Sequence, residues 1–173
     1  MAEKLYFIIG GERSGKSRFA TELAEGLTSE PCYVATARIW DEEFRHRVQR
    51  HTAERGPKWT TFEEDKRISS LPLEGKVALI DCVTLWLTNY FVDNENDVRR
   101  SLEQAKAEFT RLAEKEATLI VVSNEIGMGG HATTEVGRKF TELQGWMNQE
   151  IARHADVVVL MVSGIHLVVK GAI

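Results

Sequence analysis

Residues 10–17 read Gly10-Gly11-Glu12-Arg13-Ser14-Gly15-Lys16-Ser17, which matches the pattern GxxxxGK[ST] at every defined position. An apolar run precedes this octapeptide and an amphipathic segment begins at about Lys16, so the pattern stands between a predicted strand and a predicted helix. Glycines let backbone amides turn inward around phosphate oxygens, and the start of a helix adds partial positive charge. The stretch therefore predicts a phosphate-binding loop, in which Lys16 contacts the β- and γ-phosphates of a nucleotide and the Ser17 hydroxyl ligates Mg²⁺. The alternative is a strand–turn–helix corner that carries the pattern by chance.

Short apolar runs alternate with amphipathic segments along the rest of the chain. The runs show little period-two alternation, as is typical of parallel strands buried on both faces, and they cover residues 5–9, 32–36, 77–82, 118–123 and 157–162. Stripes of apolar residues at helical spacing begin at Phe19, Val98 and Val136. This order predicts an α/β fold with a mostly parallel sheet flanked by helices. A last run, 166–170, follows the fifth run so closely that a C-terminal antiparallel hairpin is expected.

An acidic residue at the end of a strand is the second part that a phosphate-binding loop requires. Asp81 closes the third apolar run and is the candidate to hold Mg²⁺ or its waters. An aspartate that only caps a turn is the alternative. Asp156 precedes its apolar run instead, so it should lie at the opposite edge of the sheet.

Composition excludes several classes of protein. The chain has 173 residues, 43% hydrophobic and 28% charged, which fits one globular domain over residues 1–173. A net charge of -4 excludes a chain-wide basic surface for a polyanion such as nucleic acid. Cys32 and Cys82 both fall in apolar runs, which predicts buried thiols in a reducing compartment. No apolar run approaches the roughly 18 residues of a membrane span, and no signal peptide is recognisable, so a cytoplasmic protein is expected.

The segment that follows the second run carries a second set of candidate residues. Thr36 and Ala37 lie at the carboxyl end of a predicted strand, where α/β sheets bind ligands. Further on, His51 continues the apolar face of a predicted helix, with Arg47 and Arg55 four residues away on either side. Positive neighbours lower the pKa of an imidazole, and a neutral imidazole can attack phosphorus to form a phosphoramidate. A packed, hydrogen-bonded core histidine is the alternative.

The same segment is basic within an acidic chain. Between residues 38 and 58 there are four acidic residues against six basic ones, a net charge of +2; the basic residues are Arg38, Arg45, Arg47, Arg50, Arg55 and Lys58. Positive charge is thus predicted near the phosphates of the ligand.

Two segments of the chain are distinctive: Arg47-Val48-Gln49-Arg50-His51, and Asn124-Glu125-Ile126-Gly127-Met128-Gly129. Three others accompany them: Trp59-Thr60-Thr61-Phe62-Glu63, Asp81-Cys82-Val83-Thr84 and Gly145-Trp146-Met147-Asn148-Gln149. With these segments, nearly the whole chain resembles the bifunctional adenosylcobinamide kinase/adenosylcobinamide-phosphate guanylyltransferases of cobalamin biosynthesis. The phosphate loop with Arg18 is close to the family's GG-x-RSGKS-R, although hundreds of enzyme types share such a loop, and the first two segments are far more specific.

The resemblance implies a RecA-like P-loop fold, a trimer, and both activities of the family. The expected reactions are phosphorylation of adenosylcobinamide by a nucleoside triphosphate, ATP or GTP, and transfer of GMP from GTP to adenosylcobinamide phosphate. His51 takes the position of the family's guanylylated histidine, with Lys16 assisting at the phosphates. Mg²⁺ is expected on Ser17 and Asp81. The resulting nucleotide-binding set is Gly10, Gly11, Glu12, Arg13, Ser14, Gly15, Lys16, Ser17, Thr36, Ala37, Thr52, Ala53, Glu54, Arg55, Glu63 and Asp81.

Two other functions fit the phosphate loop: a kinase of another small molecule with a structural His51, and a nucleotide-binding switch that transfers nothing. One segment departs from the family. After Gly129 the family commonly continues Ile-Val-Pro-Glu, whereas here the chain reads Gly130-His131-Ala132-Thr133. His131 is predicted to be an exposed loop residue, not an acid or base.

Overall fold

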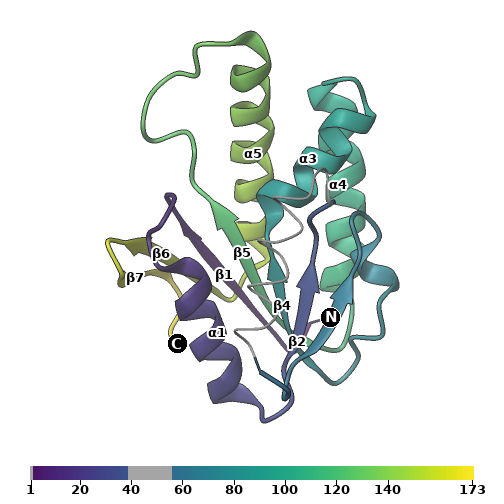
Figure 1. The fold of residues 1–173 in the computed structure, drawn as a ribbon, viewed down its shortest axis with the longest axis vertical. Helices are drawn as coiled ribbons and strands as arrows, with labels where there is room; N and C mark the ends of the chain where they lie inside the picture. The colour runs from purple at the N-terminus through teal and green to yellow at the C-terminus, as the bar shows by residue number, and fades with distance from the viewer. Residues whose placement is uncertain (1, 39–55) are drawn as a thin grey trace.

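The structure is a computed structural model that describes residues 2–38 and 56–173. Seven strands in these ranges form one sheet (Figure 1). In chain order the strands are β1 (Lys4–Gly10), β2 (Cys32–Ala35), β3 (Thr60–Glu63), β4 (Val77–Asp81), β5 (Thr118–Asn124), β6 (Val157–Val162) and β7 (Ile165–Lys170). The helices are α1 (Lys16–Leu27), α3 (Val83–Asp93), α4 (Val98–Ala113) and α5 (Glu135–His154), with a short 3-10 turn at Ile68–Ser70.

The strand order across the sheet is β3-β2-β4-β5-β1-β6-β7. All neighbouring pairs are parallel except β6 and β7, which form the expected antiparallel hairpin. The predicted α/β class, the five parallel strands and the hairpin are therefore confirmed. The order itself places β5 between β1 and β4, so the strand that ends at the phosphate loop and the strand that ends at Asp81 are not neighbours.

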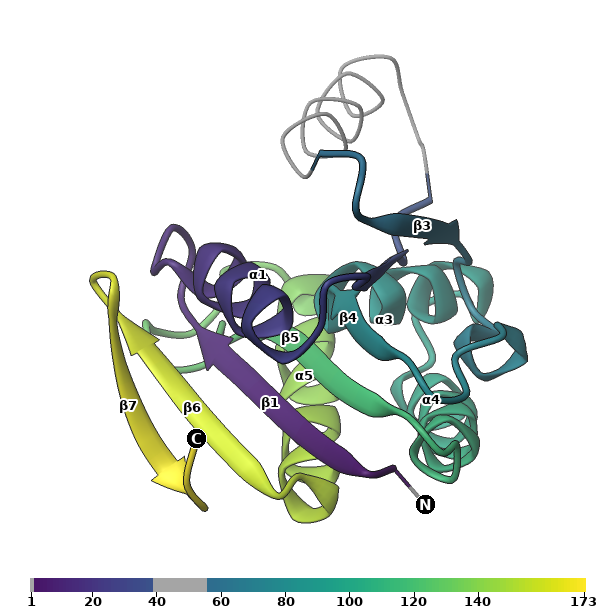
Figure 2. The ribbon, with the colours of Figure 1, turned by 90° about the horizontal axis from the view of Figure 1, so that it is seen from below.

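The helices divide into two layers (Figure 2). On one face, α1 packs with Ala20 and Ala24 against side chains such as Ile8 of β1 and Val122 of β5. On the other face, α3, α4 and α5 cover the alternate side chains of the same strands, Phe7 and Val121 among them. Apolar side chains thus point to both faces of each central strand, which explains why these strands show no period-two pattern in the sequence.

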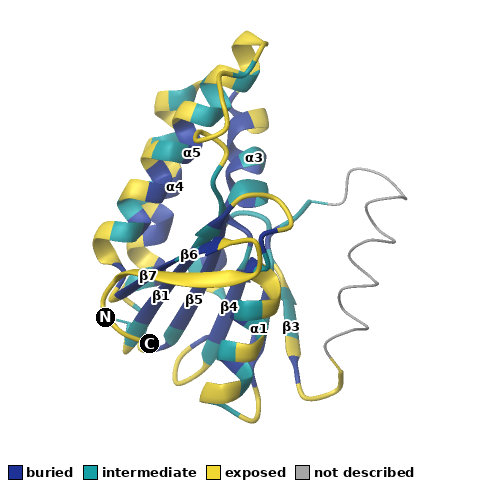
Figure 3. Ribbon diagram, turned by 90° about the vertical axis from the view of Figure 1, so that its left-hand side faces the viewer, coloured by how far each residue is buried: buried dark blue, intermediate teal, exposed yellow. Residues whose placement is uncertain are grey.

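The edge strand β7 differs from the rest of the sheet, since all six of its residues are exposed (Figure 3). Its exposed large apolar side chains are Ile165, Leu167, Val168 and Val169. A two-residue turn, Ser163-Gly164, joins β6 to β7, and both residues have positive φ angles of 51° and 82°. Such two-residue turns match the twist of a hairpin, so the short connection enforces antiparallel pairing.

Two predictions about individual residues are also confirmed. Asp156 precedes β6 at the amino edge of the sheet, where its Oδ2 accepts a hydrogen bond from the Leu5 backbone N–H at 2.7 Å. Cys32 and Cys82 are buried and free.

Within residues 2–38 and 56–173, no helix combines the length and the apolar character needed to cross a bilayer.

Candidate active site

The phosphate loop occupies the turn between the last residue of β1, Gly10, and the first residue of α1, Lys16. A side chain at Gly10 would not fit: its Cβ would lie 2.6 Å from the Met161 carbonyl oxygen and 2.7 Å from Ser14 Oγ. Gly15 has a φ of +96°, a conformation that residues with side chains rarely adopt. Both glycines of the pattern, Gly10 and Gly15, are therefore required by the shape of the loop itself, before any ligand is considered.

The β6–β7 turn supports this loop from one side. The Gly164 N–H donates a hydrogen bond to the Ser14 carbonyl oxygen at 2.9 Å. A Cβ on Gly15 would lie only 3.2 Å from Gly164 Cα, so the two backbones are in close contact. This contact was not predicted from the sequence, because nothing in the hairpin's own residues indicates which loop lies beside it.

Lys16 is held inside the loop that it begins. Its side chain is buried, and its Nζ donates a hydrogen bond to the Gly11 carbonyl oxygen at 2.6 Å. Burial lowers the pKa of the Lys16 ammonium below its usual value, and Cys82, Asp81 and Glu12 partly oppose this shift. The opposing effect of Asp81 shows that the two predicted parts of the phosphate site lie within electrostatic range of each other.

Asp81 lies at the carboxyl end of β4, as the sequence predicts. Its Oδ2 accepts a hydrogen bond from the Tyr33 hydroxyl at 3.0 Å. Thr36, the first residue after β2, is fully buried, and its hydroxyl donates to the Cys82 carbonyl oxygen at 2.8 Å. The Thr36 hydroxyl therefore links the end of β2 to the residue that follows β4. Thr36 was predicted to bind nucleotide, and in the structure its hydroxyl has this structural role.

Cys82 follows Asp81 but is not a candidate nucleophile. Burial raises the pKa of its thiol to about 12, with a further contribution from the charge of Asp81. The thiol is therefore neutral at physiological pH and chemically inert.

The predicted Mg²⁺ ligands suit a hard cation. Ser17 is exposed in the first turn of α1, and Asp81 supplies a carboxylate at the same edge of the sheet. Both offer oxygen, the atom that Mg²⁺ prefers, and a site with few protein ligands leaves positions for phosphate oxygens and water. Among the described residues, no cluster of three or more His, Cys, Asp or Glu forms a metal site of another kind.

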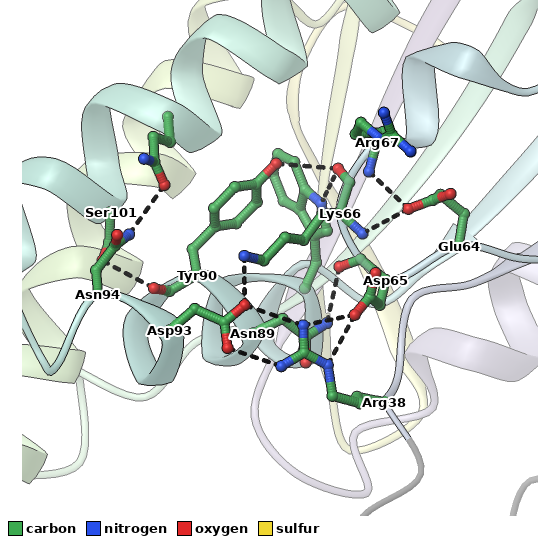
Figure 4. A network of polar contacts seen from close by, with 12 residues as sticks. Arg38, Glu64, Asp65, Lys66, Arg67, Asn89, Tyr90, Asp93, Asn94 and Ser101 are labelled. Atoms are coloured by element: carbon green, nitrogen blue, oxygen red, sulfur yellow. Dashed lines mark hydrogen bonds and ion pairs between the residues drawn. The ribbon is translucent and has the colours of Figure 1, made fainter.

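Arg38 belongs to a polar network beside this edge of the sheet (Figure 4). Its guanidinium donates to both oxygens of Asp93, at 2.8 and 3.1 Å, and its Nε donates to Asp65 at 2.7 Å. The Asn89 amide links the same region by donating to the carbonyl oxygens of Thr36 and Asp65, both at 2.8 Å. The network joins the end of β2, the segment after β3, and α3.

These contacts modify the prediction of a basic segment near the phosphates. Arg38 is paired with Asp65 and Asp93, and Lys58 forms an ion pair with Glu25 at 3.1 Å. The charges of both residues are thus balanced by carboxylates that lie outside the segment. The other four basic residues of the segment lie outside the described ranges.

The remaining predicted site residues fall into two groups. Glu63 is exposed at the end of β3 and pairs in register with Ala35, so it lies at the same edge as Thr36, Ala37 and Asp81. His131 is exposed in the loop after β5, as predicted. The other group lies outside the described residues: His51, Thr52, Ala53, Glu54 and Arg55, together with Arg47.

A polar residue also ends β5, the strand between the loop and Asp81. Asn124 pairs in register with Gly10, and its backbone N–H and side-chain Nδ2 both donate to Thr84 Oγ1, at 3.3 and 3.0 Å. In the sequence, Asn124 and Thr84 were recognised only as members of segments that resemble the family. The sequence did contain one signal for Asn124, a polar residue at the end of a buried apolar run. Its position beside the phosphate loop could be known only from the order of the strands in the sheet.

The strand–loop–helix geometry, a buried lysine and an acidic residue within its range together define a P-loop nucleotide-binding protein of the α/β class. The ATPase of a bacterial type III secretion system has a similar fold: TM-score 0.54, 11% identity, 91% of this chain and 50% of that chain covered. At this identity the likeness supports the fold alone.

Sequence comparison defines the family. The family model for cobinamide kinase / cobinamide phosphate guanyltransferase matches residues 6–169, and the chain belongs to this family. It is 36% identical over 168 residues to the bifunctional adenosylcobalamin biosynthesis protein CobP of Pseudomonas aeruginosa, covering 95% of this chain and 96% of that protein. It is 34% identical over 181 residues to the bifunctional adenosylcobalamin biosynthesis protein CobU of Escherichia coli, with 96% and 99% covered.

Proposed function

We propose that this chain, as a single domain, phosphorylates adenosylcobinamide and then transfers GMP from GTP to the resulting adenosylcobinamide phosphate. The observation that carries the proposal is the joint presence of family membership over residues 6–169 and an intact phosphate site. In that site Lys16 is buried against its own loop and lies within electrostatic range of Asp81. The substrates are inferred from family membership, and the phosphate loop with Lys16 supports the binding of a nucleoside triphosphate.

In the kinase reaction, the hydroxyl oxygen of the aminopropanol arm of adenosylcobinamide attacks the γ-phosphorus of ATP or GTP. The bond from that phosphorus to the β–γ bridging oxygen breaks, the nucleoside diphosphate leaves, and the hydroxyl proton passes to solvent. Backbone amides of the loop and the Lys16 ammonium bind the phosphate oxygens and stabilise their charge in the transition state. Ser17 and Asp81 would hold Mg²⁺, which neutralises charge on the β- and γ-phosphates when bound.

In the guanylyl transfer, a neutral imidazole nitrogen of His51 attacks the α-phosphorus of GTP, and pyrophosphate leaves with the bridging oxygen. A phosphate oxygen of adenosylcobinamide phosphate then attacks the same phosphorus, which breaks the P–N bond and gives adenosylcobinamide-GDP. Two displacements replace one difficult step, and the corrinoid binds after pyrophosphate has left. The assignment of His51, like that of Thr52, Ala53, Glu54 and Arg55 to the nucleotide, rests on the sequence resemblance.

A cytoplasmic homotrimer is the proposed form of the protein. Two buried free cysteines fit a reducing compartment. The apolar, fully exposed edge strand β7 supports self-association, because an unpaired edge with Leu167 and Val169 exposed is a surface that proteins ordinarily cover. Light scattering coupled to gel filtration tests the trimer, and a monomer at micromolar concentration would contradict it.

Two parallel labelling reactions test both activities. In one, the protein is incubated with GTP labelled at the α-phosphate, denatured, and assayed for label that is acid-labile and alkali-stable, as a phosphoramidate is. In the other, the protein is incubated with adenosylcobinamide and GTP labelled at the γ-phosphate, and label on the corrinoid is measured. The wild type should carry the α-label and His51→Ala should not, while Lys16→Ala should lose both protein labelling and the transfer of γ-label to adenosylcobinamide. Transfer of γ-label without protein labelling would indicate a simple kinase, and neither event would indicate a switch.

A further inference from the structure

Asn124 ends the strand that separates the two parts of the phosphate site. The register pairs Gly10 of β1 with Asn124, and Asp81 of β4 with Val122, two residues earlier on β5. The Glu125 N–H then donates to the Gly10 carbonyl oxygen at 2.9 Å, so β5 and β1 remain paired into the loop. Since neighbouring strands lie about 4.8 Å apart, Asn124 lies roughly one strand spacing from Gly10, where the phosphate loop begins. On the other side it lies two residues beyond the level of Asp81, the last residue of β4.

The strand alternation directs Asn124 toward the nucleotide side of the sheet. On β5, Ile120 and Val122 pack in the cluster that contains α1, whereas Val121 packs in the cluster of α3, α4 and α5. Asn124 has the same parity as Ile120 and Val122, so its side chain leaves the sheet on the face of α1. Asp81 has the parity of Leu79, which packs on this same face.

The Asn124 carboxamide is held at one end and available at the other. Its Nδ2 donates to Thr84 Oγ1 at 3.0 Å, and Thr84 lies in the first turn of α3, directly after Asp81 and Cys82. No hydrogen bond from the described residues reaches its Oδ1. An anchored amide therefore presents a neutral hydrogen-bond acceptor between the loop and Asp81.

A buried polar cluster that includes residues of α5 binds the backbone of Asn124. Asn148 of α5 accepts from the Ser123 hydroxyl at 2.7 Å and from the Gln144 amide at 3.0 Å, and its Nδ2 donates to the Asn124 carbonyl oxygen at 3.2 Å. Ser123, Gln144 and Asn148 are all buried. Apolar side chains would fill this space without desolvating polar atoms, so the cluster is explained by a need to fix the end of β5 in position.

We propose that Asn124 contacts the substrate in the kinase reaction, where its side-chain carbonyl oxygen accepts a hydrogen bond from the hydroxyl that attacks the γ-phosphorus. This inference rests on the proposed function. Phosphate oxygens accept hydrogen bonds and do not donate them, so an amide carbonyl beside the phosphate loop is not complementary to the phosphates that the loop would bind. A hydroxyl is complementary, and fixing its direction aligns its lone pair for in-line attack. The hydroxyl proton still leaves to solvent, because a neutral amide oxygen does not take it.

The same acceptor could instead face water bound to Mg²⁺, and the experiment separates these two donors. Asn124→Ala is compared with wild type in four measurements. These are γ-label transfer to adenosylcobinamide, the Kd of a non-hydrolysable GTP analogue, α-label on the protein, and the Mg²⁺ concentration for half-maximal rate. Acceptor phosphorylation should fall roughly 10- to 100-fold through kcat, as loss of an orienting hydrogen bond predicts. The Kd of the GTP analogue, the α-label on the protein and the Mg²⁺ requirement should stay within about twofold, because none of these depends on the attacking hydroxyl.

A matched pair of variants at Thr84 tests the anchor and covers the case in which Asn124→Ala fails to fold. Thr84→Ser keeps the hydroxyl that binds the Asn124 amide and should retain the kinase rate. Thr84→Val removes it at nearly constant volume and should lower acceptor phosphorylation by about 3- to 10-fold, again with an unchanged Kd for nucleotide.

Three results would overturn the inference while leaving the proposed function intact. They are an unchanged rate in Asn124→Ala, a loss of nucleotide affinity that accounts for the loss of rate, and a higher Mg²⁺ requirement, which would assign the amide to metal-bound water. Failure of the wild type to transfer γ-label to adenosylcobinamide at all would overturn the proposed function and the inference together.

Discussion

The close approach of Gly10 to β6 predicts that a single methyl group at this position destabilises the protein. In Gly10→Ala the new Cβ would lie 2.6 Å from the Met161 carbonyl oxygen, 3.1 Å from Met161 Cβ and 2.7 Å from Ser14 Oγ. The Ser14 hydroxyl can rotate away, but Met161 belongs to β6, which is paired with β1 along Tyr6 to Gly10. The strands must therefore separate locally, which costs about 1–3 kcal/mol, as overpacking of a core typically does.

The adjacent glycine provides the control for this variant. A Cβ at Gly11 meets nothing within 4 Å, so Gly11→Ala should leave the stability of the ligand-free protein within about 0.5 kcal/mol of wild type. Urea unfolding followed by circular dichroism measures the free energy of unfolding, and Gly10→Ala should also lower Tm by roughly 2–12 °C. Equal stabilities of the two variants, or a larger loss in Gly11→Ala, would refute the argument from packing.

Three further predictions concern positions outside the phosphate loop. The Thr134 hydroxyl caps α5 by accepting from the Gly137 N–H at 3.0 Å, so Thr134→Ala should cost about 0.5–2 kcal/mol in urea unfolding and Thr134→Ser should cost much less. Arg38 and then Lys66 hold the pKa of Asp93 well below its usual range, so a wild-type advantage over Asp93→Asn should be full near pH 6 and should shrink as the pH falls below about 4; a difference that does not vary with pH would contradict this assignment. The buried Cys82 thiol, with its pKa raised to about 12, should resist a thiol reagent at pH 8 and react once guanidinium unfolds the chain; rapid reaction of the native protein would contradict its burial.

The sequence predicted those elements of the fold whose signal is local. The buried strands appear as apolar runs, and the phosphate loop carries its own motif. Strand β3 was missed because it is a four-residue edge strand in which Thr60 and Glu63 are exposed, so it has no apolar run. Helix α3 was missed for the opposite reason: six of its eleven residues are buried, Trp86 and Phe91 among them, and a helix that is buried on most sides shows no clear stripe.

The candidate site likewise contains residues with a local sequence signal and residues without one. Lys16, Ser17 and Asp81 were predicted because each stands at a fixed place in a motif or at a strand end. The partners of Arg38 were not predictable, since Asp65 and Asp93 reach it from other elements, 27 and 55 residues along the chain. The place of Asn124 was equally hidden, because it depends on β5 lying between β1 and β4, and no local pattern encodes the order of strands in a sheet.

The strand order also has a consequence for how the protein is made. Strand β1, which leads into the phosphate loop, lies between β5 and β6, and these strands begin at Thr118 and Val157. At about 5–20 residues per second, a ribosome would need roughly 8 to 30 seconds after β1 to deliver β6. Until β5 is made, the apolar strand Lys4–Gly10 has no native partner on either side, and until β6 and β7 follow, the turn that supports the loop does not exist. The nascent chain thus carries its nucleotide-binding motif well before it gains the strands and the turn that complete the site around it.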